Sequence, residues 1–389
     1  MLVRRCAIVM IEPRERLDFD LTVLFRGEGA FTTHIEWLAL AAHLDQPVVL
    51  SIADLELLGR FGETLWIDRS RLPTDLSQTG IDTLLTAGLL IADSIHPEHR
   101  HRDERVRATH WRALSALTHI HSRWHDINAI RDSTAGYTDI RDMVAQLGPP
   151  PPETIDRRPT DARITLPAAP SDRLDPILHA RYTGRNYDSR AVLPLATASR
   201  LLQRSFGAQW TRELAPGAVA LKKTSPSGGS LHPTEAYLLV QRVEGIAPGL
   251  YHYHPIDHAL EPLATLTDTA ARTTALRFVA DQHWFADAPL MVVLATRAQR
   301  NFWKYRNHPK AYRAVLLDAG HLSQTFYLLA AEAGLPAFIT AAINEVEIEQ
   351  AFGLDPIDDL VVAVLGCGPA AEHPETVEFR HIPHLPDPH

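Results

Sequence analysis

The chain has 389 residues, of which 45% are hydrophobic and 22% charged, so we expect two domains with a substantial core. Its net charge of -9 argues against nucleic-acid binding, which needs a basic face, and two cysteines (Cys6 and Cys367) exclude a disulfide framework. The longest apolar runs fall short of a membrane span and the run at 7–11 is too short for a secretory signal, so we expect a cytoplasmic protein.

Residues 1–147 are predicted to form a mixed α/β domain. A helical pattern covers 36–43, an apolar strand covers 48–52, and residues 81–91 fit a helix that turns at Gly88 into a strand. Helix, turn and strand in this order resemble a winged-helix arrangement. Apolar side chains spaced by three and four residues predict a further helix within 111–130.

The function of such a domain stays open at this point. Winged-helix domains often bind nucleic acid, but in peptide-modifying systems a similar domain holds a leader peptide against an exposed strand. The acidic balance of the chain favours the leader peptide. A scaffold or dimerisation domain without a ligand is an equally open interpretation.

A proline-rich stretch follows this domain. Gly148 precedes four consecutive prolines, which cannot lie inside a helix or a central strand. We interpret residues 148–170 as a semi-rigid linker, with a proline-rich loop inside a single domain as the alternative.

Residues 171–389 are predicted to form a second, larger domain. A helix is expected at 198–206, and nearly continuous apolar runs predict central strands at 236–243, 249–254, 289–296 and 359–366. Residues 312–334 carry apolar side chains in all directions, so this helix is expected to be buried nearly all round.

A loop of small residues precedes the first of these strands. Ser225, Pro226 and Ser227 lead into Gly228 and Gly229, and a proline follows four residues later. Glycines let a backbone approach a flat or anionic ligand, and hydroxyl groups add hydrogen-bond donors. From the residues alone, this segment is a ligand-cradling loop.

The loop resembles the Pro-Ser-Gly-Gly-x-x-x-Pro loop of nitroreductase-like flavoenzymes, and most closely the SagB-type branch of peptide-maturation dehydrogenases. The resemblance implies that residues 171–389 adopt a nitroreductase-like, FMN-dependent α+β fold, with a homodimer and FMN bound at the dimer interface; the winged-helix-like α/β domain would precede it. It also implies that Ser225, Pro226, Ser227, Gly228 and Gly229 contact the flavin.

A second motif begins at Arg181. Arg181 and Arg185 are four residues apart with Thr183 between them, a spacing that suits a forked contact with a phosphate. A solvated basic turn is the alternative. The segment resembles the Arg-Arg-Ser-x-Arg-x-Phe entry motif of nitroreductases, which implies FMN contacts for Arg181, Tyr182, Thr183 and Arg185, although Tyr182 stands where that family has Arg or His. Arg380 is predicted as a further phosphate ligand.

Lys304 and Tyr305 lie just before the predicted long helix. They resemble the Lys-Tyr pair of SagB-type dehydrogenases, which implies a catalytic base for the substrate proton; a surface turn is the alternative. A base in this role needs a lowered pKa, which we expect to come from burial or from neighbouring cations such as Arg306. Three histidines at 252–258 lack a completing ligand set, so no metal site is predicted.

The resemblance implies an FMN-dependent dehydrogenase that oxidises azolines in a precursor peptide to azoles, with a cyclodehydratase as a possible partner. Two alternatives remain: an NAD(P)H-dependent reductase of nitro compounds or quinones, and a non-catalytic partner that binds flavin or leader peptide within a synthetase complex.

Overall fold

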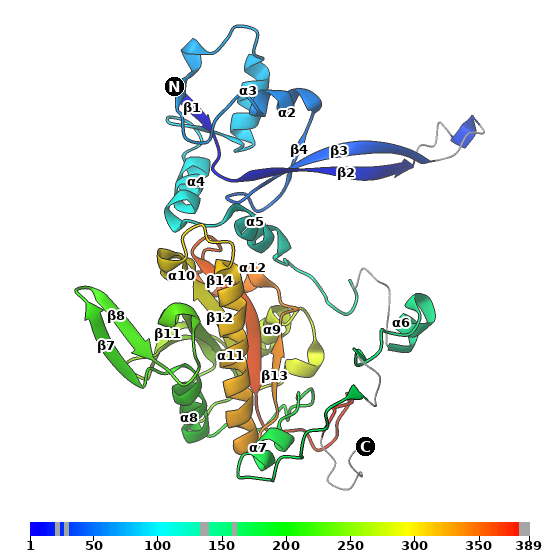
Figure 1. The fold of residues 1–389 in the computed structure, drawn as a ribbon, viewed down its shortest axis with the longest axis vertical. Coiled ribbons are helices and arrows are strands. Elements are labelled where there is room, and N and C mark those ends of the chain that lie inside the picture. The colour runs from blue at the N-terminus through cyan, green and yellow to red at the C-terminus, as the bar shows by residue number, and fades with distance from the viewer. Residues whose placement is uncertain (20–23, 27–30, 133–139, 158–161, 381–389) are drawn as a thin grey trace.

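The computed structural model describes residues 1–19, 24–26, 31–132, 140–157 and 162–380. A smaller N-terminal part stands above a larger part built around one sheet, and helices α4 and α5 lie between them (Figure 1). Residues 148–157 and 162–170 contain no α-helix or strand.

The first small sheet is centred on β1 (Leu2–Arg5), which pairs antiparallel with β5 (Ile67–Asp68) and β6 (Leu90–Ala92). Helices α2 (Ile52–Leu58) and α3 (Gln78–Thr86) begin at capping serines, Ser51 and Ser77, whose side chains accept backbone amide hydrogens. The predicted helix and strand within 81–91 are confirmed. Gly88, at φ +76°, makes the turn between them.

A second sheet contains β2 (Val9–Phe19), β3 (Phe31–Ala41) and β4 (Val48–Leu50). The helix predicted at 36–43 is wrong, because these residues lie mostly in β3. Trp37 is opposite Pro13 of β2 on one side and Leu50 of β4 on the other. Cross-strand pairing with two neighbours outweighs the helical propensity of this Leu- and Ala-rich run. The strand predicted at 48–52 is confirmed in its first three residues.

Three helices follow: α4 (Pro97–Thr109), α5 (Ala113–Ser122) and α6 (Ile140–Leu147). Of the helix predicted within 111–130, only α5 forms. Beyond it, the backbone N–H of Trp124 donates to Glu345 (2.8 Å) and that of Ile127 donates to Asn344 (3.0 Å). These amides bind the larger part of the molecule, so they are not available to continue the helix.

The larger part contains a six-stranded antiparallel sheet in the order β11-β10-β9-β12-β14-β13. All four strands predicted from apolar runs are confirmed and lie inside the sheet. The strands are β9 (Thr234–Val240), β10 (Gly249–His254), β11 (Ala259–Thr265), β12 (Leu290–Arg297), β13 (Ala337–Thr340) and β14 (Asp359–Cys367).

Helices cover both faces of this sheet. Alternate residues of β9 and β12 face a core formed with α8 (Leu195–Phe206) and α11 (Ala311–Glu332) on one side. The others face α9 (Asp268–Phe278) and α12 (Glu345–Phe352). The remaining elements are η1 (Arg69–Arg71), α7 (Asp175–Ala180), the hairpin of β7 (Trp210–Ala215) and β8 (Ala218–Lys222), η3 (Gly228–Ser230), η4 (His283–Phe285) and α10 (Ala298–Lys304).

The predicted long helix is confirmed as α11, but the expectation that it is buried nearly all round is wrong for the single chain. Leu316 is 49% exposed and Leu317 is 62% exposed, and Gly320, His321 and Gln324 are exposed as well. One stripe of α11 therefore faces solvent in this structure.

Candidate active site

The glycine loop is anchored to the N-terminal half of α11 by Asp318. The buried carboxylate of Asp318 accepts hydrogen bonds from Ser227 Oγ (2.5 Å) and from the backbone N–H of Gly228 (2.9 Å). Ser225 Oγ lies 2.7 Å from Thr325 Oγ1 on the same helix, and Pro226 lies between the two serines. Both serine hydroxyl groups are thus engaged by the protein, which holds the loop in one conformation.

The loop meets the predicted Lys-Tyr pair at Gly229. Lys304 Nζ donates to the carbonyl oxygen of Gly229 at 3.4 Å. Gly229 has φ +62°, and a Cβ atom there would come within 2.7 Å of both Lys304 Nζ and Tyr305 Oη. The structure therefore brings the predicted base residues and the predicted ring-binding loop together.

The environment of the pair differs from the expectation in one respect. The side chain of Lys304 is exposed and that of Tyr305 is half-buried, so the expected burial is not found at Lys304 in this structure. Arg306 donates to the carbonyl of Trp303.

The turn that begins at Arg181 is attached to the C-terminal half of α11. Thr183 Oγ1 lies 3.1 Å from Tyr327 Oη, and the guanidinium of Arg181 lies 5.5 Å from the centroid of the same tyrosine ring. The N–H of Gly184 donates to the carbonyl of Ala337 in β13 (2.8 Å). Neither Arg181 nor Arg185 forms an ion pair within the described ranges.

Residues near the end of the described chain complete this turn. Arg380 forms an ion pair with Glu378, and its guanidinium lies 4.5 Å from the ring centroid of Tyr182. The other oxygen of Glu378 accepts the backbone N–H groups of Arg185 (2.5 Å) and Asn186 (3.0 Å). The structure thus brings Tyr182, Arg185 and Arg380 together, but it also places the carboxylate of Glu378 among them.

The two predicted cofactor-binding segments do not meet within one chain. The loop is attached to α11 at Asp318 and at Thr325, which lie seven residues apart on one face of the helix, and the Arg181 turn is attached at Tyr327. Tyr327 lies nine residues after Asp318, about two and a half helical turns, so the loop and the Arg181 turn are held on opposite faces of α11. In Figure 1, α10 lies at one end of α11 and α7, just before Arg181, at the other.

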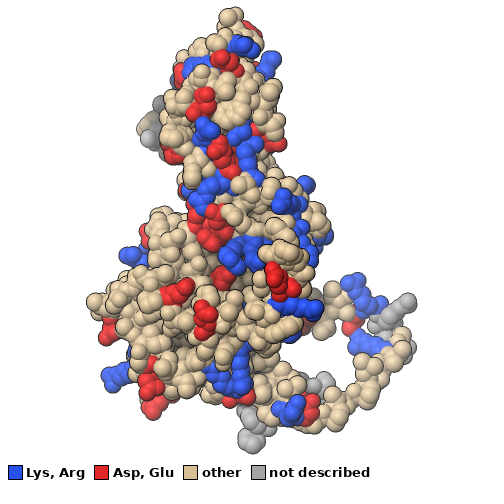
Figure 2. All heavy atoms as spheres, turned by 90° about the vertical axis from the view of Figure 1, so that its left-hand side faces the viewer, with Lys and Arg blue, Asp and Glu red and all other residues tan. Residues whose placement is uncertain are grey.

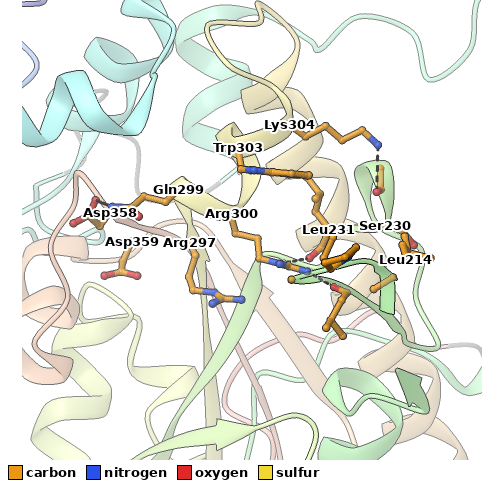
Figure 3. Close-up of a pocket in the computed structure, with 16 residues that line it drawn as sticks. Leu214, Ser230, Leu231, Arg297, Gln299, Arg300, Trp303, Lys304, Asp358 and Asp359 are labelled. Atoms are coloured by element: carbon orange, nitrogen blue, oxygen red, sulfur yellow. Dashed lines mark hydrogen bonds between the residues drawn. The ribbon is translucent and has the colours of Figure 1, made fainter. Parts of the chain in front are cut away.

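A pocket of about 1090 Å³ opens beside Lys304. Its walls are the β7–β8 hairpin, residues 229–231 of the loop, helix α10 and the start of β14 (Figure 3). Sequence analysis gave no site role to four residues here: Arg297, Arg300 and Trp303 around the pocket, and Asp318 behind the loop. A signal existed only for Asp318, an acidic residue inside an otherwise apolar helical run.

Among the described residues no group of three or more His, Cys, Asp or Glu side chains could hold a metal ion. His252 instead pairs with Glu235 and Glu261, and His258 contacts Ser199 and Tyr253. In the same part of the chain, none of the helices is both long and apolar enough to span a bilayer.

Residues 178–368, which include the Arg181 turn, the loop and the Lys-Tyr pair, match the Nitroreductase family. This segment is a nitroreductase-family domain. Membership of this family indicates an oxidoreductase, and the predicted nitroreductase-like α+β fold is confirmed.

Two relatives and one solved structure are similar to the chain. A Methanocaldococcus jannaschii protein described as a nitroreductase is 29% identical over 187 residues, which are 48% of this chain and 87% of that protein. The microcin B17-processing protein McbC of Escherichia coli is 28% identical over 191 residues, which are 47% of this chain and 66% of McbC, just under two thirds of its length. A chain of the E. coli microcin synthetase McbBCD complex with truncated pro-MccB17 bound matches with a TM-score of 0.52 and 22% identity, over 69% of this chain and 97% of that chain.

The structural match shows the fold alone. The nitroreductase domain and the similarity to McbC support the SagB-type branch that the sequence motifs indicated.

Proposed function

We propose that the protein is an FMN-dependent dehydrogenase that matures ribosomally made peptides by oxidising thiazoline or oxazoline rings to azoles. The contact of Lys304 and Tyr305 with Gly229 carries this proposal, because it places two candidates for the catalytic base against a loop suited to a flat ligand. The similarity to a microcin B17-processing protein supports a peptide substrate.

The residues of the Arg181 turn fit the phosphate of FMN. Arg181 and Arg185 carry positive charge that no carboxylate of the described residues neutralises, and guanidinium groups suit forked contacts with phosphate. Arg380 already forms an ion pair with Glu378, so it would contribute less to phosphate binding than Arg181 and Arg185. Main-chain groups of the loop at Gly228 and Gly229 would lie against the ring, because no Cβ atom stands there.

The chain's own residues would manage the proton. Converting an azoline to an azole removes two hydrogens from adjacent ring atoms, one as a proton and one as a hydride. Bound FMN supplies the hydride acceptor. Lys304, as the neutral amine, or Tyr305, as the phenolate, would accept the proton, and their shared contact with Gly229 would hold both near the same ring.

A homodimer would unite the two cofactor-binding segments. A two-fold axis across α11 would set the two helices antiparallel, so the loop of one chain would approach the Arg181 turn of the other. The exposed stripe at Leu316 and Leu317 offers an apolar surface for that contact. Each site would then take its phosphate ligands from one chain and its loop from the other.

The N-terminal part, predicted as residues 1–147, is proposed to bind the leader peptide of the precursor. Strand β2 forms one edge of the β2-β3-β4 sheet, and a free strand edge can accept an extended peptide. A cyclodehydratase that makes the azolines is the proposed partner enzyme. Titration of the full chain with a candidate leader peptide tests the first point, and the absence of saturable binding would remove it.

A flavin spectrum and an azoline-oxidation assay on the purified protein test the proposed function. Purified protein should show a flavin spectrum, and it should convert an azoline-containing peptide to the azole with a mass loss of about 2 Da, two hydrogens. The double variant Lys304→Ala with Tyr305→Phe should keep the flavin but lose about 100-fold or more of this activity. Protein that stays colourless after incubation with FMN would refute the proposal.

One alternative has its own support. The M. jannaschii relative is described as a nitroreductase, which fits an NAD(P)H-dependent reductase. Rapid oxidation of NAD(P)H with a nitroaromatic or quinone acceptor, unaffected by the double variant, would favour that reductase.

A further inference from the structure

The pocket beside Lys304 has walls of two different kinds. Leu214 and Val219 of the hairpin and Trp303 of α10 give it an apolar side, and all three are exposed to solvent. Arg297 and Arg300 give it a basic side, and Figure 3 shows both side chains directed away from α10, with Arg300 reaching toward Leu231. Such a mixture suits a peptide, which has both apolar and polar groups.

The pocket is lined by three cationic side chains and two carboxylates: Arg297, Arg300, Lys304, Asp358 and Asp359. Arg297 pairs with Glu235 (2.9 Å), and Asp358 on the far side pairs with Arg105 of α4. Arg300 instead donates to two main-chain carbonyls, of Leu231 (2.8 Å) and Val219 (3.2 Å), and has no ion pair with any residue that the structure describes.

Arg300 keeps spare donors. A guanidinium has five N–H groups, and the two carbonyls occupy two of them. The same two bonds tie strand β8 to the glycine loop, so the side chain is held in place before any ligand arrives. A fixed guanidinium without an acidic partner is suited to a carboxylate.

We propose that this pocket binds the part of the substrate peptide next to the azoline, and that Arg300 recognises a carboxylate there. The inference rests on the proposed peptide dehydrogenase and names a feature of its substrate. The carboxylate belongs to an acidic side chain or to the C-terminus of the peptide. The apolar stem of the same segment lies along Trp303 and the hairpin.

Short peptides test this without knowledge of the natural precursor. Three hexapeptides carry a neutral dye at the N-terminus: Gly-Ser-Gly-Asp-Gly-Gly amide, Gly-Ser-Gly-Asn-Gly-Gly with a free C-terminus, and Gly-Ser-Gly-Asn-Gly-Gly amide. Fluorescence anisotropy with the purified full chain gives each Kd. We expect one of the two charged peptides to bind about tenfold more tightly than the neutral one. If the Asp peptide binds more tightly, the recognised group is a side-chain carboxylate. If the peptide with the free C-terminus binds more tightly, the recognised group is a C-terminal carboxylate.

Two variants connect the preference to the pocket. Arg300→Gln should abolish it, and Arg300→Lys should restore part of it. Because Arg300 also holds the loop, Val219→Asp provides an independent test: this new charge on the pocket wall should weaken the charged peptides alone. Leu263→Asp on β11, where Leu263 is 47% exposed and Val219 is 45% exposed, is the matched control and should change nothing.

Equal Kd values for all three peptides overturn the pocket assignment, as does a preference that both Arg300→Gln and Val219→Asp leave intact. These outcomes are separate from the proposed function. A flavin-containing, active dehydrogenase without the preference overturns only the pocket. Colourless protein that still prefers the charged peptide refutes the dehydrogenase and supports the pocket.

Discussion

The indole ring of Trp111 lies 4.6 Å, centroid to centroid, from the ring of Phe302. Trp111 stands between α4 and α5, and Phe302 belongs to α10, two residues before Lys304. The indole N–H donates to the carbonyl of Ile357 at 3.0 Å. The N-terminal part therefore supports the helix that carries the proposed base.

Lys/Arg and Asp/Glu side chains are interspersed on the face shown in Figure 2, rather than forming one basic area.

The first prediction concerns the support of α10 by Trp111. Trp111→Ala should lower the free energy of unfolding by about 3–5 kcal/mol, because Trp111 is 4% exposed and its removal leaves a large cavity. Urea unfolding followed by circular dichroism measures the change. Trp210→Ala, at a 59% exposed tryptophan, should cost about 1 kcal/mol or less. Equal losses in the two variants would mean that Trp111 does not support the core.

The second prediction separates backbone strain from displacement of the base. Gly229→Ala and Gly245→Ala both place a side chain at positive φ, +62° and +72°, so each should cost about 1 kcal/mol of stability. Only the Cβ at residue 229 would collide with Lys304 and Tyr305, whereas nothing lies within 4 Å of the one at residue 245. Peptide-oxidation rates should fall about tenfold or more in Gly229→Ala and change little in Gly245→Ala. Similar rates in both would contradict the active-site assignment.

The third prediction tests the dimer. Leu317→Glu places a charge on the exposed stripe of α11 and should convert a dimer to monomers, because burying an unpaired charge is costly. Light scattering after size exclusion measures the mass, and flavin absorbance of the same fractions measures cofactor retention. The matched variant Leu263→Glu should leave mass and flavin unchanged. A monomeric wild-type protein with full flavin occupancy would refute the shared site.

The fourth prediction concerns pH. Burial lowers the pKa of His119 from 6.5 to about 3, with Arg123 acting in the same direction, and burial lowers the pKa of His43 to about 4. A neutral histidine is therefore required in the folded chain, so these groups contribute stability above pH 6.5 that is lost as pH falls toward 4. His119 stacks on Trp111 with ring centroids 5.7 Å apart, so His119→Phe preserves a ring at this position.

Thermal unfolding between pH 7 and pH 4.5 checks the pH prediction. The wild type should lose stability more steeply than His119→Phe, and the exposed His101→Phe control should follow the wild type. Parallel curves for wild type and His119→Phe would show that His119 does not titrate in this range.

Sequence patterns predicted the features that depend on neighbouring residues. Apolar runs identified β9, β10, β12 and β14, and α11 followed from its length and apolar content. The glycine loop and the Lys-Tyr pair were recognisable because each is a contiguous motif. Residues 36–43 were predicted wrongly, because Leu and Ala suit either a helix or a buried strand and only the pairing of β3 with β2 and β4 decides between them.

The sequence by itself determined the local elements and the residue types available for a phosphate, a flat ring and a proton. Only the tertiary structure decided that Asp318 and Tyr327 hold the two proposed cofactor-binding segments on opposite faces of α11, that Trp111 supports α10, and that Arg300 lies in a pocket beside Lys304. The physical reason is that these relations join residues far apart along the chain. They depend on how whole helices and strands pack, and no short stretch of sequence contains that information.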